Sequence, residues 1–111
     1  MPSDKFLLEK QLNWEPAGDK VRRQIMGYNN DLMLVKVEFE TAAVGAEHSH
    51  PHTQSTYVAK GKFKVNISGD EKILETGDGF LVEPNALHWC VCLEEGILID
   101  SFSPCRQDFL K

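Results

Sequence analysis

The feature that most constrains the fold of this chain is an alternation of apolar and polar side chains at every second position. The clearest example covers residues 33–39, where the apolar members are Met33, Val35, Val37 and Phe39. Successive side chains of a β-strand point to opposite faces, so this pattern predicts a strand with one buried face. Similar runs follow one another with turn residues about every eight to twelve positions, which is typical of an antiparallel sandwich or barrel.

The pattern as a whole predicts an all-β protein of about seven to nine short strands. Besides residues 33–40, we expect strands over residues 21–26, 56–59, 62–68, 72–75, 80–82, 88–93 and 96–102. Gly61 is expected to end one strand and Pro104 the last, and residues 16–19 have the composition of a turn. Residues 3–14 predict a short helix or an arm laid along the body, and we expect no helix elsewhere.

Length and composition bound the class of protein. At 111 residues the chain is one domain, which we divide into an N-terminal arm over residues 1–19 and a barrel over residues 20–111. The formal net charge of −5 argues against non-specific nucleic-acid binding, and no apolar run approaches the ~20 residues of a membrane span. The start of the chain lacks a signal-peptide pattern, so we expect a cytoplasmic protein with free thiols at Cys90, Cys92 and Cys105.

Three of the four histidines lie in one short stretch, at His48, His50 and His52. If this stretch is extended, His48 and His50 project from the same face, and His52 joins them only if Pro51 does not bend the chain away. Two neighbouring imidazoles can bind one divalent metal ion. We rank this metal site above the alternative, a solvated polar loop whose histidines have no shared role.

Two further residues can complete a set of four metal ligands. Gln54 offers an amide oxygen, and His88 is the only remaining histidine. Such a set is neutral, so a bound ion keeps its full positive charge, which suits Lewis-acid chemistry or anion binding. Zn²⁺, Ni²⁺, Mn²⁺ and Fe²⁺ are all compatible with these ligands. We rank His52 below His48, His50 and His88, as a hydrogen-bonding neighbour of the site or a surface residue.

The expected last strand carries a carboxylate among apolar side chains. Leu98, Asp100 and Phe102 share one face, while Ile97 and Ile99 share the other. Both faces are largely apolar, so we expect the strand to be covered on both sides. A buried carboxylate costs free energy unless it is paired, hydrogen-bonded or near a metal. Asp100 is therefore either a structural group, capping a turn or pairing with an arginine, or an acid–base group whose pKa is tuned by burial.

Two motifs, in this order, resemble those of the cupin family of small β-barrels. The first cupin motif places a third ligand after His48 and His50 at the position of Gln54, and a glycine follows at Gly61. Gln54 replaces the usual glutamate, and Ala42 stands where the motif begins with glycine. The resemblance spans residues 32–103 and implies a single-domain jelly-roll barrel.

The second cupin motif begins at Gly77 and reaches its histidine at His88. Cupins usually have proline, glycine and asparagine at three positions that are here Glu83, Asn85 and Cys92. Asn85 is an acceptable replacement for glycine because asparagine tolerates a positive φ better than most residues.

Within that family the chain resembles the KdgF-type pectin-degradation proteins. The most specific match is the tail over residues 100–109, with the pattern Asp-x-Phe-Ser-Pro-x-Arg-x-Asp-Phe, and the group also has glutamine at the position of Gln54. The resemblance implies a metal-dependent isomerase that converts 4,5-unsaturated uronates, released by pectin and alginate lyases, into linear 5-keto-4-deoxyuronates. It implies metal ligands at His48, His50, Gln54 and His88, and substrate-site residues at Asp100, Phe102 and Arg106.

The chemistry of that reaction is compatible with these side chains. Opening a cyclic hemiacetal needs a base for the hydroxyl, an acid for carbon and a fixed cation. Asp100 could shuttle the proton, Arg106 could bind the carboxylate bidentately, and Phe102 could pack on the sugar ring. Without the tail motif, Arg106 would be a surface arginine and Phe102 a core residue. Arg22 and Arg23 lie on opposite faces of one strand, and of the two we expect Arg23 to enter the pocket.

Two other functions are compatible with the motifs. A cupin dioxygenase would need Fe²⁺ and O₂, and Gln54 argues against it because the usual glutamate partly neutralises the ion and supports oxygen chemistry. A non-catalytic cupin would bind a sugar acid without turning it over. For both the isomerase and the non-catalytic cupin, the expected partner is a small sugar acid. Cupins of this size commonly form homodimers, and the apolar arm and last strand fit a homodimer.

Overall fold

The computed structural model describes residues 2–111 as an antiparallel β-structure with a short 3₁₀ turn near each end of the chain. Met1, the first residue of the expected arm, lies outside this range. The strands are β1 (Glu15–Gly18), β2 (Val21–Tyr28), β3 (Met33–Phe39), β4 (Val44–His48), β5 (Thr53–Ile67), β6 (Asp70–Glu75), β7 (Gly79–Val82) and β8 (His88–Ser103). The 3₁₀ turns are η1 (Glu9–Gln11) and η2 (Gln107–Leu110). The predicted all-β structure is confirmed.

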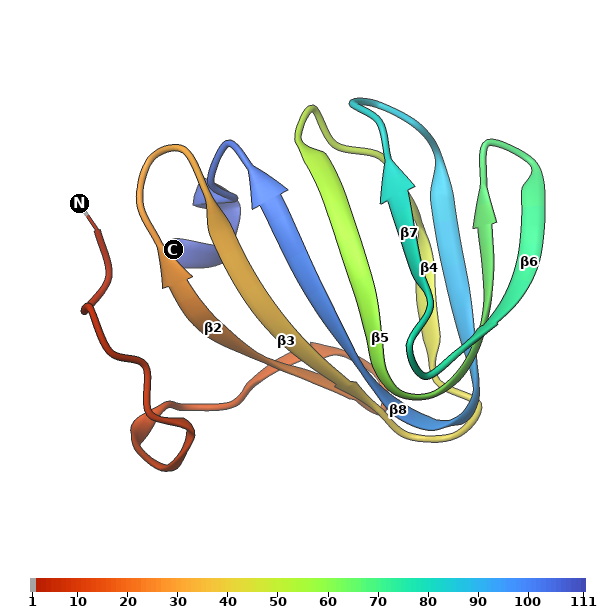
Figure 1. Ribbon diagram of the computed structural model, residues 1–111, viewed down its shortest axis with the longest axis horizontal. Helices are drawn as coiled ribbons and strands as arrows, with labels where there is room; N and C mark the ends of the chain where they lie inside the picture. The colour runs from red at the N-terminus through yellow and green to blue at the C-terminus, as the bar shows by residue number, and fades with distance from the viewer. Residues whose placement is uncertain (1) are drawn as a thin grey trace.

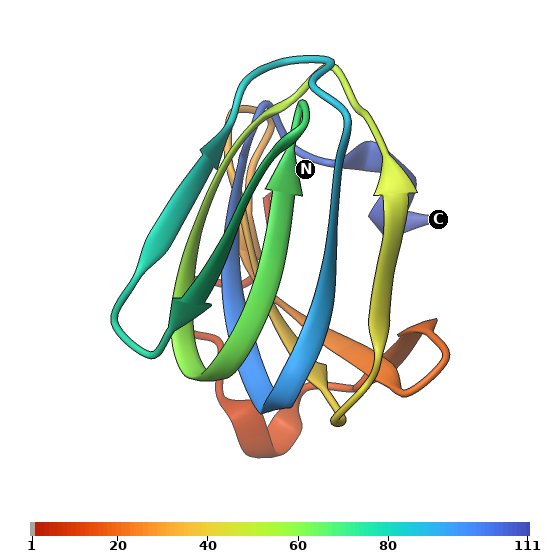
Figure 2. The same cartoon turned by 90° about the vertical axis from the view of Figure 1, so that its right-hand side faces the viewer.

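Two long strands, β5 and β8, organise the molecule because each bends and so belongs to both halves of it. The first half of β5 pairs with β7 and with the second half of β8, beside which lie β3, β2 and β1. The second half of β5 pairs with β6 and with the first half of β8, which also pairs with β4. Figure 1 shows these halves as the two limbs of a U, and Figure 2 shows the same limbs from the side.

The bends lie where two glycines approach each other. Gly61 has a φ of +92°, and a Cβ atom on it would lie 2.6 Å from the carbonyl oxygen of Glu95. A Cβ atom on Gly96 would overlap the carbonyl oxygen of Lys60. The register between β5 and β8 also shifts at this point, as it does at a β-bulge. The bends in β5 and β8 therefore depend on the absence of a side chain at both positions.

The same glycines explain the largest error of the sequence prediction. Gly61 does not end a strand: the expected strands over residues 56–59 and 62–68 are one continuous strand, β5. Likewise the expected strands over residues 88–93 and 96–102 are one strand, β8. Pro104 does follow the end of β8, as predicted.

Smaller differences concern the ends of the chain. The turn expected at residues 16–19 lies at residues 19–20, because Glu15–Gly18 pairs with β2 as β1. Helical structure is also present outside the first residues, since the amide of Phe109 donates to the carbonyl of Arg106 and closes η2. No helix among residues 2–111 is long and apolar enough to cross a membrane.

The N-terminal arm is held against the barrel by a buried side chain of β2. Gln24 is fully buried, and its amide donates to the carbonyl oxygens of Glu9 and Leu12 at 3.2 and 3.3 Å. The apolar core lies between the limbs and takes its side chains from the inner faces, with Met33, Val35, Val58, Phe63 and Cys92 fully buried. The outer face of β8 is only half-buried, so the expectation that both of its faces are covered is wrong for that face.

We predict that Gly61→Ala destabilises the protein by about 3 kcal/mol, because the alanine has a strained φ and its Cβ atom overlaps the backbone of β8. Gly69→Ala is the matched control: Gly69 has a φ of +91°, and a Cβ atom on it would have no neighbouring atom of residues 2–111 within 4 Å. It should cost about 1 kcal/mol, from backbone strain alone. Urea unfolding measures the free energy of unfolding of the two variants. Equal losses of stability would contradict the role assigned to the contact between Gly61 and β8.

Candidate metal centre and active site

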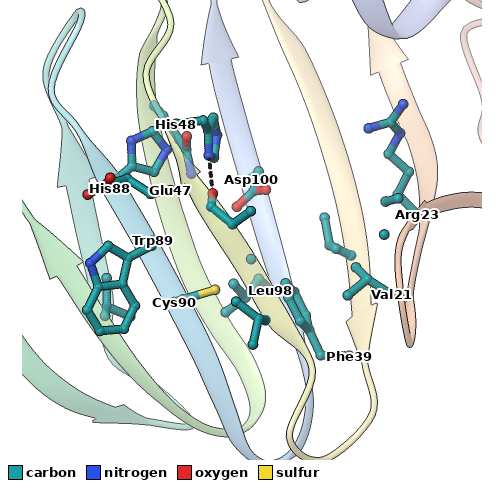
Figure 3. Close-up of a pocket in the computed structure, with 18 of the residues that line it drawn as sticks. Val21, Arg23, Phe39, Glu47, His48, His88, Trp89, Cys90, Leu98 and Asp100 are labelled. Carbon is teal, nitrogen blue, oxygen red and sulfur yellow. Dashed lines mark hydrogen bonds between the residues drawn. The ribbon is translucent and has the colours of Figure 1, made fainter.

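A cavity of about 480 Å³ opens between the two limbs of the barrel. Figure 3 shows His48 and His88 side by side at one side of it, and Arg23 on the strand at the other side. Asp100 lies between them in this view, with Leu98 below it. In this view the labelled imidazole, carboxylate and guanidinium groups lie in the upper part of the cavity, and Phe39, Cys90 and Leu98 lie in its lower part.

Three histidines converge at the polar end of the cavity. His48 ends β4 and is the register partner of His88, the first residue of β8. His50 lies in the loop that follows, so it reaches the other two from beyond the strand rather than from a shared strand face. One ring nitrogen of each histidine lies within 4.8 Å of the others. This cluster could hold a metal ion.

Backbone carbonyls orient the three imidazole rings. Each Nδ1 lies beside a carbonyl oxygen: that of Ala46 for His48 at 2.8 Å, that of His52 for His50 at 3.1 Å and that of Ala86 for His88 at 2.9 Å. These contacts favour a proton on Nδ1 and leave the Nε2 lone pair free, which is the form that binds metals. Burial lowers the pKa of His88 and so keeps that ring neutral.

A nitrogen without a partner and a close pair of acceptor atoms indicate that a cation fits this cluster. Within residues 2–111, the Nε2 atom of His88 is buried and has no hydrogen-bond partner. The Nε2 atom of His50 lies 2.9 Å from Oε1 of Gln54, and both are acceptors when the proton is on Nδ1. A divalent ion bound by these atoms would satisfy all of them. Three of the four ligands expected from the sequence thus converge, and the amide oxygen of Gln54 lies beside one of them, His50.

His52 does not join the cluster. Its ring centroid lies 5.5 Å from that of His50 and 6.5 Å from that of Phe102, and its nitrogens are not among the converging atoms. Its pKa is lowered, chiefly by burial and then by the nearby charge of Arg106. Its position is that of a packing neighbour of the cluster.

Asp100 lies on the inner face of β8, across from Thr56 of β5. Burial raises the pKa of Asp100 to about 6, although a hydrogen bond from Thr56 and the charge of Arg106 both act to lower it. The Thr56 hydroxyl donates to Oδ1 of Asp100 at 2.7 Å and accepts from Nε2 of Gln54 at 2.9 Å. None of the ion pairs among residues 2–111 includes Asp100. The structural alternative, pairing with an arginine, is therefore not observed.

Two arginines meet at the ring of Phe109, which η2 brings to the cavity. The guanidinium carbon of Arg23 lies 3.7 Å from the ring centroid, and that of Arg106 lies 4.1 Å from it. Each arginine also has an acidic partner: Glu15 for Arg23 at 2.7 Å, and Asp108 for Arg106 through two hydrogen bonds of 2.8 and 3.0 Å. The geometry places two guanidinium groups together on the lining of one cavity.

Phe102, the remaining residue expected from the tail motif, is 3% exposed and lies beneath this group. Its ring is edge-on to Phe109 at 5.8 Å and to His50 at 5.6 Å, and Arg106 lies 5.0 Å from its centroid. Phe102 thus contacts both the histidine cluster and Arg106 of the arginine pair, and it also lines the cavity.

Sequence reasoning missed two residues of this region, Thr56 and Phe109. Thr56 follows Gln54 by two positions on one strand, so the alternation that paired His48 with His50 could have placed it on the cavity face. Phe109 belongs to the tail motif, but its contact with Arg23 depends on the path of the tail, which no periodicity encodes.

Comparison with known proteins gives consistent matches. A family model of the cupin domain matches residues 35–99. The pectin degradation protein KdgF of Dickeya dadantii (strain 3937) is 44% identical over 108 residues, covering 96% of this chain and 98% of that protein.

Solved structures agree with these matches. An RmlC-like cupin from Shewanella frigidimarina NCIMB 400 is 44% identical, with a TM-score of 0.94 and 97% of each chain covered. The structure of KdgF from Halomonas sp. is 35% identical, with a TM-score of 0.91, covering 96% of this chain and 99% of that one.

We predict that His88→Ala weakens binding of Zn²⁺ or Ni²⁺ by more than about 100-fold, because loss of a ligand should exceed the 10–100-fold cost of losing a ligand's hydrogen-bond partner. His52→Ala is the matched control, since its ring lies beside the cluster without converging on it. Calorimetric titration of protein purified without an affinity tag measures both affinities. Equal loss in the two variants would contradict the proposed ligand set.

Proposed function

Since the chain belongs to the cupin family and matches KdgF over nearly its whole length, we propose that it is a metal-dependent isomerase of 4,5-unsaturated uronates. The product is the linear 5-keto-4-deoxyuronate. One observation carries the proposal: a carboxylate, two guanidinium groups and two of the three converging histidines, His48 and His88, line the same cavity. A uronate offers one partner to each, namely a transferable proton, a carboxylate and polar oxygens.

The reaction moves one proton and involves no change of oxidation state overall. The hemiacetal hydroxyl on C1 loses its proton as the bond between C1 and the ring oxygen breaks, which leaves an aldehyde at C1. The ring oxygen remains on C5 as an enolate. A proton then adds to C4, and C5 becomes a ketone. The protein must therefore remove a proton from oxygen, stabilise the enolate and deliver a proton to carbon.

Asp100 is the proposed proton carrier. Its pKa of about 6 leaves most of the carboxylate ionised at neutral pH, so it can accept the hydroxyl proton. The raised value also makes the protonated form a competent acid for the second step. It accepts a hydrogen bond from Thr56 and takes part in none of the ion pairs among residues 2–111, so no basic side chain of the fold neutralises it directly.

Arg106 and Arg23 are the proposed binding groups for the uronate carboxylate. Arg106 is the more buried of the two, with 11% of its side chain exposed against 21% for Arg23. Their shared contact with Phe109 keeps both guanidinium groups near one point on the cavity lining. A planar guanidinium matches a carboxylate through two parallel hydrogen bonds. Phe102 supplies an apolar surface beside them for the sugar ring.

The proposed metal ligands are His48, His50, Gln54 and His88, all neutral. A divalent ion bound by them would supply Lewis-acid stabilisation of negative charge on a substrate oxygen. Gln54 keeps that charge undiminished, which favours this function over a cupin dioxygenase. Proton transfer and binding of the uronate carboxylate are assigned to side chains of the protein, as described above.

We predict that the purified protein accelerates the loss of the enol-ether absorbance of an unsaturated galacturonate over the rate in buffer. Asp100→Asn should lower kcat by at least about 100-fold and leave the metal content unchanged, because an amide cannot accept the proton. In the wild type, kcat/KM should fall as the pH drops through about 6, where Asp100 becomes protonated. Absorbance kinetics and metal analysis measure these effects.

Further measurements beside the absorbance assay separate the alternatives. Consumption of O₂ in an oxygen electrode would indicate a dioxygenase. Tight binding of the uronate in a calorimeter without any product would indicate a non-catalytic cupin. Loss of metal in Asp100→Asn would mean that Asp100 is a ligand or a structural group rather than the proton carrier.

We predict that Arg106→Lys raises KM about tenfold, because lysine keeps the charge but loses one of two parallel hydrogen bonds to the carboxylate. Arg22→Lys is the matched control: Arg22 lies 4.0 Å from the ring of Trp14 and pairs with Glu38 on the outside of the barrel. It should leave KM unchanged. Steady-state kinetics of both variants measure this, and an unchanged KM in Arg106→Lys would contradict the assignment of the carboxylate site.

A further inference from the structure

Gln54, Thr56 and Asp100 form a continuous hydrogen-bond chain on the inner face of the barrel. Nε2 of Gln54 donates to Oγ1 of Thr56 at 2.9 Å, and the Thr56 hydroxyl donates to Oδ1 of Asp100 at 2.7 Å. Gln54 and Thr56 are 6% and 3% exposed. The backbone register places Thr56 directly opposite Asp100. Sheet pairing therefore holds the three side chains together, and burial shields Gln54 and Thr56 from competing water.

The chain has only one consistent direction. A hydroxyl has one proton, and an ionised carboxylate can only accept, so the proton of Thr56 goes to Asp100. The Thr56 oxygen must then receive its second hydrogen bond from a donor, which is the amide NH₂ of Gln54. Reversing the amide would set two acceptors against each other. With the NH₂ committed to Thr56, Oε1 of Gln54 faces the histidine cluster, 2.9 Å from Nε2 of His50.

We propose that Thr56 is a positioning residue that couples the amide of Gln54 at the metal cluster to the carboxylate of Asp100. This inference rests on the proposed function for the role of Asp100 as proton carrier. Thr56 aims the amide oxygen of Gln54 toward the histidines and holds the carboxylate of Asp100 in its ionised form. Thr56 is itself neither a proposed metal ligand nor the proposed proton carrier, and it acts through its hydrogen bonds to those two neighbours.

The coupling also accounts for glutamine at the position where cupins usually have glutamate. A glutamate carboxylate at residue 54 has no hydrogen to donate to Thr56. The single Thr56 proton would then be shared between two carboxylates, and one of them would have to take up a proton or turn away. An amide at this position removes the conflict. Gln54 and Asp100 are thus compatible because Thr56 lies between them.

The surroundings of Asp100 make the effect of Thr56 measurable. Its register partner on β3 is Val35, which carries no charge. The charged or titratable groups that act on it are Arg106, from the tail, and Cys90, from its own strand. Replacing the Thr56 hydroxyl leaves both in place. Because the hydrogen bond stabilises the ionised carboxylate, its loss must raise the pKa of Asp100.

We expect Thr56→Val, which keeps the shape of the side chain, to shift the acidic limb of the kcat/KM profile upward by about one pH unit or more. Thr56→Ser keeps the hydroxyl and should restore the wild-type profile. Ser55→Ala is the matched control, because it removes a hydroxyl from the neighbouring position, which is exposed. The carbon-13 carboxyl signal of Asp100, identified by its loss in Asp100→Asn, follows the same titration without turnover in the protein as purified.

Two results would overturn the inference: a Thr56→Val titration equal to that of the wild type, or a Thr56→Ser titration that moves as far as Thr56→Val. Circular dichroism checks folding, and Thr56→Ala takes the place of Thr56→Val if the latter does not fold. Absence of turnover in the wild type would refute the proposed isomerase instead. The carboxyl titration would still decide whether Thr56 controls Asp100.

Discussion

The structure depends on the close backbone contact between β5 and β8 at Gly61 and Gly96, where both strands bend. Close backbone contact there lets both strands bend without breaking, so each contributes to both limbs of the barrel. His88 and Asp100 lie in different halves of one strand, and the bend turns both toward the same cavity. A straight β8 would separate them along its length, since each residue of a strand adds about 3.3 Å. The histidine cluster and the carboxylate are thus brought together by two residues that have no side chains.

The alternation of side chains predicted most of the strands because each buried face is a local property of the sequence. It failed at Gly61 because a glycine that ends a strand and a glycine that permits a bulge look the same locally. The difference lies in Gly96 on another strand, and that contact depends on the completed sheet. The error at β8 has the same origin. Sequence periodicity therefore locates strands better than it decides their continuity.

The candidate site shows a similar division between local and long-range information. The spacing of His48 and His50 places their rings together even though His50 lies beyond the end of β4, because a turn can also bring alternate residues to one point. Gln54 and His88 were assigned through ligand chemistry and family spacing rather than through geometry. The contact of Arg23 with Phe109 could not be predicted in this way. It requires the tail to return to β2, which depends on tertiary packing rather than on local sequence.

The charges around the cavity complement one another in a way that suits an anionic sugar. Arg23 and Arg106 each have an acidic partner at the surface, so the lining carries little excess charge on that side. A divalent ion held by neutral ligands would make the other side strongly positive, with Asp100 as the nearby carboxylate. That field would favour the ionised form of Asp100, whereas burial opposes it. A uronate carboxylate bound at the arginines would oppose ionisation again, so binding of the proposed substrate would shift Asp100 toward the protonated form, which the proposed reaction needs for proton delivery to carbon.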